Sequence, residues 1–172
     1  SITIPESVTS IGRSAFSGCT GLMGVTILKN VITIGDYAFH GCTGLTSITI
    51  PESVKSIGES AFRGCTGLTS IYIPSSVTMI GEEVFQSCYN LTVYGVKGSY
   101  AETYAVNSNR HFIAVSPTVD ESLWQYEVID GKTTVTGVDP SVSGDVVIPF
   151  MLGGYLVTEI GENAFNRRAD LT

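Results

Sequence analysis

The stretch from Ile50 to Tyr72, IPESVKSIGESAFRGCTGLTSIY, recurs with variations on both sides of itself. Isoleucine, phenylalanine and cysteine each return at intervals of 23 residues. The three series are Ile4, Ile27, Ile50 and Ile73; Phe16, Phe39, Phe62 and Phe85; and Cys19, Cys42, Cys65 and Cys88. A fixed period of this kind is typical of repeat proteins, in which one copy cannot bury its apolar face until its neighbours stack on it.

Each copy contains a segment of the form L-x-x-I-x-I, for example residues 45–50. Successive side chains of a strand point to opposite faces, so Ile48 and Ile50 are predicted to face inward and Thr49 outward. A second segment, S-V-x-x-I-G, supplies another inward pair such as Val54 and Ile57. The sequence therefore predicts two short strands per repeat.

The rest of each repeat is predicted to turn the chain back. Gly58 and its counterparts favour a turn whose backbone conformation a side chain would obstruct. The x-x-A-F-x-x-C piece that follows is expected to be a short helical or 3₁₀ turn that directs Ala61 and Phe62 inward. The phenylalanine column is interpreted as core rather than as a ligand cage.

The pattern IPxSVxxIGxxAFxxCxxLxxI, present in residues 50–71 and in the neighbouring copies, resembles the leucine-rich repeats of BspA-like bacterial surface proteins. The prediction is a mostly β repeat solenoid, a right-handed leucine-rich repeat stack of short strands with 3₁₀ or helical turns and a 23-residue period. The resemblance implies an extracellular, cell-surface location and a role in adhesion.

Residues 1–116 are predicted to form a first array of four repeats, closed by a C-terminal cap at residues 96–115. An open solenoid end exposes apolar core and needs a cover. Ser99 and Glu102 fit a capping box at the start of a helix, and Tyr100 and Tyr104 are predicted to share one face of it. Residues 111–115 are predicted to be a strand.

Residues 117–172 are predicted to hold a linker that begins at Ser116-Pro117, a β-hairpin cap at 123–138, and the start of a second array. Asp130-Gly131 is a strong hairpin-turn signal. A two-residue turn there predicts three cross-strand pairs, namely Val128 with Thr133, Tyr126 with Val135 and Trp124 with Gly137.

The second array is expected to begin where Val147-Ile148-Pro149 restarts the repeat pattern. Residues 160–165 then repeat residues 57–62. The segment from Phe150 to Tyr155 is predicted to hold a five-residue insertion relative to the earlier copies. The apolar face of the hairpin is predicted to pack on this repeat.

Both ends of the sequence lie inside a repeat. Residues 1–5 match residues 47–51, and Leu171-Thr172 matches Leu45-Thr46. We therefore expect a longer parent protein with its targeting and anchoring segments elsewhere. The strand edge at residues 1–4 is expected to be able to pair end to end with another chain.

Composition excludes several classes of partner. Hydrophobic residues make up 43% and charged residues 15% of the chain, which is typical of an ordered, core-building protein. The formal net charge is -7 and no cluster of Lys and Arg occurs, so nucleic acid and anionic membrane surfaces are not expected partners. No run of 18 apolar residues and no signal peptide occur, so this chain is not expected to insert into a membrane.

The sequence predicts no catalytic residues, no cofactor and no metal site. The four cysteines lack the close spacing of a zinc site, and equivalent side chains in stacked repeats point the same way rather than toward one another. They are interpreted as a ladder of buried free thiols, which Arg168 replaces in the second array. His40 and His111 belong to no catalytic or metal motif. The chain is therefore predicted not to be an enzyme.

The outward face of the strand stack is the candidate binding surface. The predicted partner-binding residues are Thr26, Thr46, Ser47, Thr49, Thr69, Ser70 and Tyr72. Hydroxyls around an aromatic anchor suit a protein or glycan on a host or neighbouring cell. Two alternatives stay open: threonine also simply favours solvated strands, and the array could be a structural spacer or stalk with no ligand of its own.

Overall fold

The computed structural model describes residues 1–115, 120–129, 132–144, 146, 148–149, 151–153 and 155–171, apart from the side chains of residues 155 and 156. The chain divides into two compact units, Ser1–Ser116 and Pro117–Thr172. Four sequence-based predictions fall outside the described residues: the linker at Ser116-Pro117, the turn at Asp130-Gly131, the restart at Val147 and the insertion residue Phe150.

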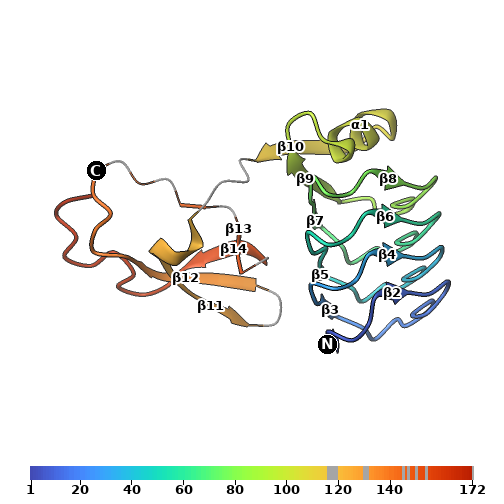
Figure 1. The fold of residues 1–172 in the computed structure, drawn as a ribbon, viewed down its shortest axis with the longest axis horizontal. Coiled ribbons are helices and arrows are strands. Elements are labelled where there is room, and N and C mark those ends of the chain that lie inside the picture. The colour runs from blue at the N-terminus through green and yellow to red at the C-terminus, as the bar shows by residue number, and fades with distance from the viewer. Residues whose placement is uncertain are drawn as a thin grey trace. The chain divides into compact units, whose positions relative to one another are not determined.

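The first unit is a stack of turns with a column of strands on each side (Figure 1). One column is parallel and runs in the order β1-β3-β5 and then β7-β9-β10. Its strands are β1 (Ile2–Ile4), β3 (Gly24–Ile27), β5 (Ser47–Thr49), β7 (Ser70–Ile73), β9 (Thr92–Val96) and β10 (His111–Val115). The predicted repeat solenoid with a 23-residue period is confirmed.

The other column is a four-stranded parallel sheet in the order β2-β4-β6-β8. Its two-residue strands are β2 (Ser10–Ile11), β4 (Thr33–Ile34), β6 (Ser56–Ile57) and β8 (Met79–Ile80). Ile11 pairs in register with Ile34, and Ile57 with Ile80. Each repeat therefore contributes one strand to each column, as the two apolar segments predict.

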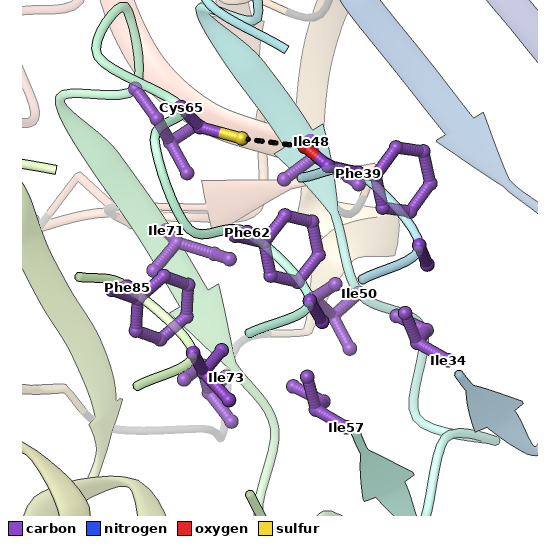
Figure 2. Packing of buried hydrophobic residues seen from close by; sticks show 14 of the residues in the cluster. Ile34, Phe39, Ile48, Ile50, Ile57, Phe62, Cys65, Ile71, Ile73 and Phe85 are labelled. Atoms are coloured by element: carbon purple, nitrogen blue, oxygen red, sulfur yellow. Dashed lines mark hydrogen bonds between the residues drawn. The ribbon is translucent and has the colours of Figure 1, made fainter. Parts of the chain in front are cut away.

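The core of the first unit is built around stacked phenylalanine rings (Figure 2). The ring centroids of Phe39 and Phe62 are 5.2 Å apart, and those of Phe62 and Phe85 are 5.6 Å apart. All three rings are fully buried, and inward isoleucines from both strand columns surround them. The prediction that the phenylalanine column is core is confirmed for these three rings, while Phe16 in the first turn and Phe165 in the second unit are only partly buried.

A ladder of thiol hydrogen bonds runs beside the rings. Each buried thiol donates to the carbonyl oxygen of the phenylalanine 26 residues earlier: Cys42 to Phe16 at 3.0 Å, Cys65 to Phe39 at 3.1 Å and Cys88 to Phe62 at 3.2 Å. The sequence predicts buried free thiols but not these bonds. It is also wrong about Cys19, which is exposed.

The predicted helical or 3₁₀ turn is instead a run of hydrogen-bonded turns with a left-handed residue near its start. In the third repeat, Ala61 N–H donates to Gly58 O and Arg63 N–H donates to Ser60 O. The φ angle is 56° at Ser14, 57° at Tyr37, 51° at Ser60 and 53° at Glu83. A second left-handed residue follows four positions later, at Gly18, Gly41, Gly64 and Ser87, so the segment does not continue as a helix.

The glycine two residues before the left-handed residue, such as Gly58 before Ser60, is required because the preceding turn lies close to it and not because of its φ angle. A Cβ atom at Gly58 would lie 2.5 Å from the backbone nitrogen of Asp36 in the preceding turn, and one at Gly81 would lie 2.6 Å from that of Glu59. Neither glycine has a positive φ. A side chain at this glycine would therefore be obstructed, as predicted, but by the backbone of the preceding turn and not by the glycine's own conformation.

The array ends in helix α1 (Tyr100–Asn107) and strand β10. Ala101 and Ala105 are buried, and the ring of Tyr104 lies edge-on to Phe85 at 5.8 Å. Ser99 is the N-cap as predicted, but neither hydrogen bond of the predicted capping box forms. The Ser99 side chain makes no capping hydrogen bond, and Glu102 Oε2 accepts from the Gly98 N–H at 2.6 Å, one residue before the N-cap.

The second unit is a four-stranded sheet in the order β11-β12-β14-β13, preceded by a short 3₁₀ helix. Its elements are η1 (Glu121–Leu123), β11 (Trp124–Ile129), β12 (Lys132–Val138), β13 (Met151–Leu152) and β14 (Tyr155–Ile160). Strands β13 and β14 pair antiparallel, Met151 with Leu156 and Leu152 with Tyr155, so the pairing begins in the predicted insertion and extends one residue beyond it.

The hairpin of β11 and β12 confirms two predicted pairs and corrects a third. Val128 pairs with Thr133 and Tyr126 with Val135, but Trp124 pairs with Val138 rather than Gly137. A bulge between Gln125 and Tyr126 adds one residue to the partner strand and shifts the register beyond it.

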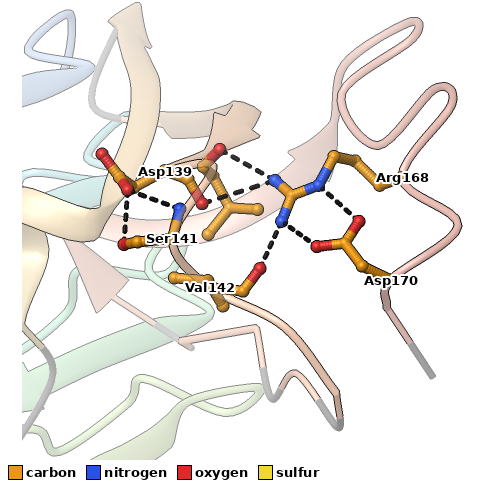
Figure 3. A network of polar contacts seen from close by, with 6 residues as sticks. Asp139, Ser141, Val142, Arg168 and Asp170 are labelled. Atoms are coloured by element: carbon orange, nitrogen blue, oxygen red, sulfur yellow. Dashed lines mark hydrogen bonds and ion pairs between the residues drawn. The ribbon is translucent and has the colours of Figure 1, made fainter.

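The hairpin occupies the position that a preceding turn has in the first array. Gly161 N–H donates to Val135 O at 2.7 Å, as Gly35 N–H donates to Ile11 O at 2.8 Å. The Trp124 ring lies edge-on to Phe165 at 6.5 Å. Arg168, at the cysteine position, donates through its guanidinium to the carbonyl of Val142, 26 residues earlier (Figure 3).

Candidate functional site

We define the strand face as the outward-pointing residues of β1, β3, β5, β7, β9 and β10. Burial alternates along β3, β5, β7 and β9, so that in β7 Ile71 and Ile73 are buried while Ser70 and Tyr72 are partly exposed. The fold therefore separates support from surface in each repeat, since one set of side chains packs inward and the other lines the outer face.

Most of the predicted partner-binding residues lie together on this face. Ser47 pairs with Gly24 and Thr49 with Thr26, which are direct neighbours in the parallel register. Strand β7, which carries Ser70 and Tyr72, lies next to β5. The period places Tyr72 after Thr49 in the same column.

Thr46 and Thr69 lie one residue before their strands, at the margin of the strand face, and both are exposed. The Thr46 hydroxyl donates to Met23 O at 3.1 Å, and its N–H donates to the same oxygen at 2.9 Å. The carbonyl of Thr69 accepts from Thr92 N–H at 2.9 Å. Thr46 is thus engaged in holding adjacent turns together.

The strand face continues beyond the predicted residues into β9 and β10. Tyr72 pairs in register with Tyr94, and Ser70 with Thr92. His111 follows beside Thr92, and the Thr92 Oγ1 to His111 Nδ1 distance is 3.4 Å. The face therefore carries two neighbouring tyrosines, whereas the sequence analysis predicts one aromatic anchor.

Tyr94 is missed because the repeat shortens at this point. Ile71 pairs with Val93, one residue less than the period, so the pattern L-x-x-I-x-I no longer matches after Leu91. The alternation of Val93, Tyr94, Gly95 and Val96 is the signal that could have identified the outward tyrosine.

The environment of Tyr72 keeps its phenol protonated. Burial raises the pKa of Tyr72, and the nearby charge of Glu52 raises it further. The phenol is therefore a neutral group that can donate and accept hydrogen bonds at neutral pH.

A second polar cluster lies on the turns and joins three repeats. The Tyr37 hydroxyl donates to Glu59 Oε1 at 2.7 Å, the Arg13 guanidinium carbon lies 5.4 Å from the Tyr37 ring centroid, and the His40 ring lies edge-on at 5.9 Å. The hydrogen bond to Glu59 is the main reason that the pKa of Tyr37 is raised. These groups bind one another across the stack and act as inter-repeat contacts.

The described residues show no group of three or more His, Cys, Asp or Glu that could hold a metal ion. One shallow hollow, of about 320 Å³, lies in the second unit, and neither histidine lines it. Its lining residues are Ile148, Pro149, Val157, Thr158, Glu159 and Ile160. Within the part of the chain that the structure describes, no helix is long and apolar enough to span a bilayer.

Comparison with protein families gives a match to the model described as BspA type Leucine rich repeat region (6 copies), over residues 1–106. No curated protein sequence matches the chain significantly. A leucine-rich repeat protein from Bacteroides ovatus has a similar solved structure, with a TM-score of 0.56 and 37% identity over 63% of this chain. The match covers 28% of that protein.

Two further solved structures are similar at lower TM-scores. A leucine rich cell surface protein from Faecalibacterium prausnitzii A2-165 is 30% identical over 61% of this chain and 34% of its own, with a TM-score of 0.49. The leucine-rich repeat protein of T. pallidum is 27% identical over 54% of this chain and 57% of its own, with a TM-score of 0.47.

Proposed function

The chain belongs to the BspA-type leucine-rich repeat family, and from this premise we propose that it is a non-enzymatic binding module of a cell-surface protein. The resemblance seen in the sequence is confirmed by the family match over residues 1–106. On this proposal the solenoid is the support, and the strand face contacts a protein or glycan on a host or neighbouring cell.

One observation carries the proposal: the strand face is a continuous surface with a pair of tyrosines in register. Thr26 and Thr49 lie side by side, and Tyr72 lies beside Tyr94. Tyrosine is enriched among the few residues that dominate binding energy, and hydroxyls supply adaptable polar contacts around such anchors. The partner-binding residues proposed are Thr26, Thr46, Ser47, Thr49, Thr69, Ser70 and Tyr72, and we add Tyr94 because it pairs in register with Tyr72.

The proposal extends to the parts of the chain that frame this surface. Residues 117–172 would be the start of a second array, with the hairpin at 123–138 as its N-terminal cap, because Gly161 N–H donates to Val135 O and the Arg168 guanidinium donates to Val138 O, as they would to a preceding turn. The edge of β1 would allow end-to-end strand pairing with another chain.

The test is a binding assay on matched variants. The chain is captured on immobilised extracellular-matrix proteins and glycans, and compared with Tyr72→Ala and Thr49→Arg. Each should weaken capture about tenfold, the effect of losing one dominant contact. Tyr89→Ala is the control, because Tyr89 is 79% exposed and lies outside the strand face.

The competing function is that of a structural spacer, which would use the stack only for its length. In that case the Tyr72→Ala and Thr49→Arg variants would be captured as well as the unchanged chain. Equal capture of all variants, with folding verified by circular dichroism, would remove the binding-module proposal.

A further inference from the structure

The strand face carries no charged side chain at its outward positions. These positions are Thr3, Gly24, Thr26, Ser47, Thr49, Ser70, Tyr72, Thr92, Tyr94, Val96, His111, Ile113 and Val115. The chain has a formal net charge of -7, so its charges are placed elsewhere. Charged groups do lie near it: the Glu52 carboxylate is close enough to Tyr72 to raise the pKa of that phenol, and Lys29 and Glu6, which follow β3 and β1 in the chain, form an ion pair at 3.9 Å.

An uncharged face is poorly suited to charged partners. Nucleic acids, anionic lipids and sulfated or uronic glycans are held by clustered Lys and Arg, and long-range steering needs complementary charge. Protein interfaces are enriched in arginine as well as in aromatic residues, and the outward positions of this face contain none. The charge pattern therefore favours a neutral ligand.

The remaining chemistry of the face matches a polyhydroxylated chain. Every Ser and Thr hydroxyl can both donate and accept a hydrogen bond. Neighbouring strands lie about 4.8 Å apart, which is close to the length of one hexose unit in an extended glycan. Tyr72 and Tyr94 pair at this spacing and add aromatic surface on which sugar rings can stack.

We infer that the strand face binds an extended, uncharged glycan, with Tyr72 and Tyr94 as the stacking residues and the hydroxyls of Ser70 and Thr92 beside them as hydrogen-bonding groups. This inference rests on the proposed function and names the class of partner. The glycan runs along the stack, so that successive sugars meet successive strands.

The experiment is affinity electrophoresis of the whole chain in native gels that contain one polysaccharide each. The neutral probes are hydroxyethyl cellulose, a mixed-linkage β-glucan and a galactomannan, and the charged probes are heparin and alginate. Retardation by at least one neutral polymer is expected, and none by the charged polymers.

The variants Tyr72→Leu and Tyr94→Leu place an apolar side chain in each strand and remove the ring together with its hydroxyl. Each is expected to raise the polymer concentration needed for half-maximal retardation about tenfold. Tyr89→Leu is the matched control and should behave like the unchanged chain, since Tyr89 is an exposed tyrosine in a loop. Thermal unfolding of each variant shows whether the fold is kept.

Two outcomes would overturn the inference. Either no neutral polymer retards the chain, or the tyrosine variants are retarded as strongly as the unchanged protein. Capture by a matrix protein that depends on Tyr72, without retardation by any neutral glycan, would contradict the glycan ligand and leave the binding-module function standing. If neither retardation by a neutral glycan nor Tyr72-dependent capture by a matrix protein is seen, both the glycan ligand and the binding-module function are contradicted.

Discussion

The first array and the second unit use different side chains to donate hydrogen bonds to the backbone carbonyl 26 residues earlier. In the stacked turns, a buried thiol donates to a carbonyl 26 residues earlier, as Cys65 does to Phe39. In the second unit Arg168 donates to the carbonyl at the same separation, Val142, and also to those of Val138 and Asp139. The position in the stack is kept while the donor changes.

At the end of the first array an arginine likewise takes the place of a cysteine thiol as the hydrogen-bond donor. Arg110 Nη2 donates to Phe85 O at 2.7 Å, and Nη1 donates to Cys88 O at 2.6 Å. A further turn would have brought a thiol to the Phe85 carbonyl. A guanidinium has five donors where a thiol has one, so one arginine can satisfy several carbonyls where no complete turn follows or precedes.

The two units therefore differ in what holds their turns together. Inside the first array a complete turn lies on each side, and apolar rings and weak thiol donors suffice. Next to the hairpin of the second unit, charged hydrogen bonds replace part of the stacking. Three sets of substitutions and one pH series test this difference.

The largest expected effect is that of truncating the phenylalanine column. Phe62→Ala should lower the free energy of unfolding by about 3 to 5 kcal/mol, because the ring is fully buried between Phe39 and Phe85. Phe165→Ala should cost about 1 to 2 kcal/mol, because Phe165 is only partly buried and meets Trp124 edge-on.

Denaturant unfolding separates the two effects, since Trp124 is the single tryptophan and its fluorescence reports the second unit. Far-UV circular dichroism reports the whole chain. A loss for Phe62→Ala no larger than that for Phe165→Ala would show that the two columns are equally packed and would end the comparison.

The second effect concerns the arginine at the end of the array. Arg110→Ala removes the charged donor from two backbone carbonyls, which keep only the bonds from Cys88 N–H and Leu91 N–H, and a hydrogen bond to a charged group is worth about 1.5 to 3 kcal/mol. We expect a loss of about 2 kcal/mol in unfolding free energy, with water recovering part of the cost.

Arg110→Lys is the matched control, because it keeps the charge but not the forked donor geometry. It should recover less than half of the loss. Hydrogen exchange at the amide of Cys88, which donates to Phe85 O, should quicken in the alanine variant. Unchanged exchange there would show that α1 alone covers the end of the stack.

The sequence predicts well the features that recur in every repeat, and poorly the irregularities that occur only once. A 23-residue period places the rings and both strand columns, because each position is sampled four times in one chain. The bulge that moves Trp124 to Val138 and the deletion that hides Tyr94 each occur once, so no internal copy reveals them.

The candidate site shows the same limit. The outward Thr and Ser columns follow from strand alternation, and the structure places them on one face. The second tyrosine lies in the shortened repeat, and the arginine donors depend on side-chain reach across the stack. Their contacts depend on the three-dimensional packing, which the spacing of residues does not encode.

The third effect is a difference in pH response. Burial raises the pKa of the Cys42, Cys65 and Cys88 thiols. Their contribution to stability is present below the thiol pKa of the unfolded chain, about 8.5, and is lost as pH rises toward the raised values. The first array should therefore weaken in alkali.

The second unit should weaken in acid. Hydrogen bonds from Ser141 lower the pKa of Asp139, and the bond from Arg168 lowers that of Asp170. This stabilisation is present above the unfolded aspartate pKa of about 3.9 and is lost as pH falls through the lowered values. Asp170 is exposed and Asp139 is only partly buried, so the effect is small and salt-sensitive.

Thermal melts between about pH 3 and pH 10 check both directions, with Trp124 fluorescence for the second unit. Iodoacetamide at about pH 8 provides the matched chemical test: it should modify Cys19, which is exposed, and spare the three buried thiols. Equal labelling of all four cysteines in the folded chain would contradict the closed thiol ladder.

The smallest effect separates the two units at the left-handed position of the turn. Ser60 has a φ of 51°, is fully buried, and its hydroxyl makes no hydrogen bond within the described chain. Ser60→Gly removes both the backbone strain and the unsatisfied hydroxyl, and should stabilise the first array by about 0.5 to 1 kcal/mol.

Asn163 is the counterpart of Ser60 in the second unit, with a φ of 63°. Asparagine tolerates this conformation and Asn163 is exposed, so Asn163→Gly should change unfolding by less than about 0.5 kcal/mol. Equal gains in unfolding free energy for Ser60→Gly and Asn163→Gly would mean that relief of backbone strain accounts for the effect and that the buried Ser60 hydroxyl contributes nothing.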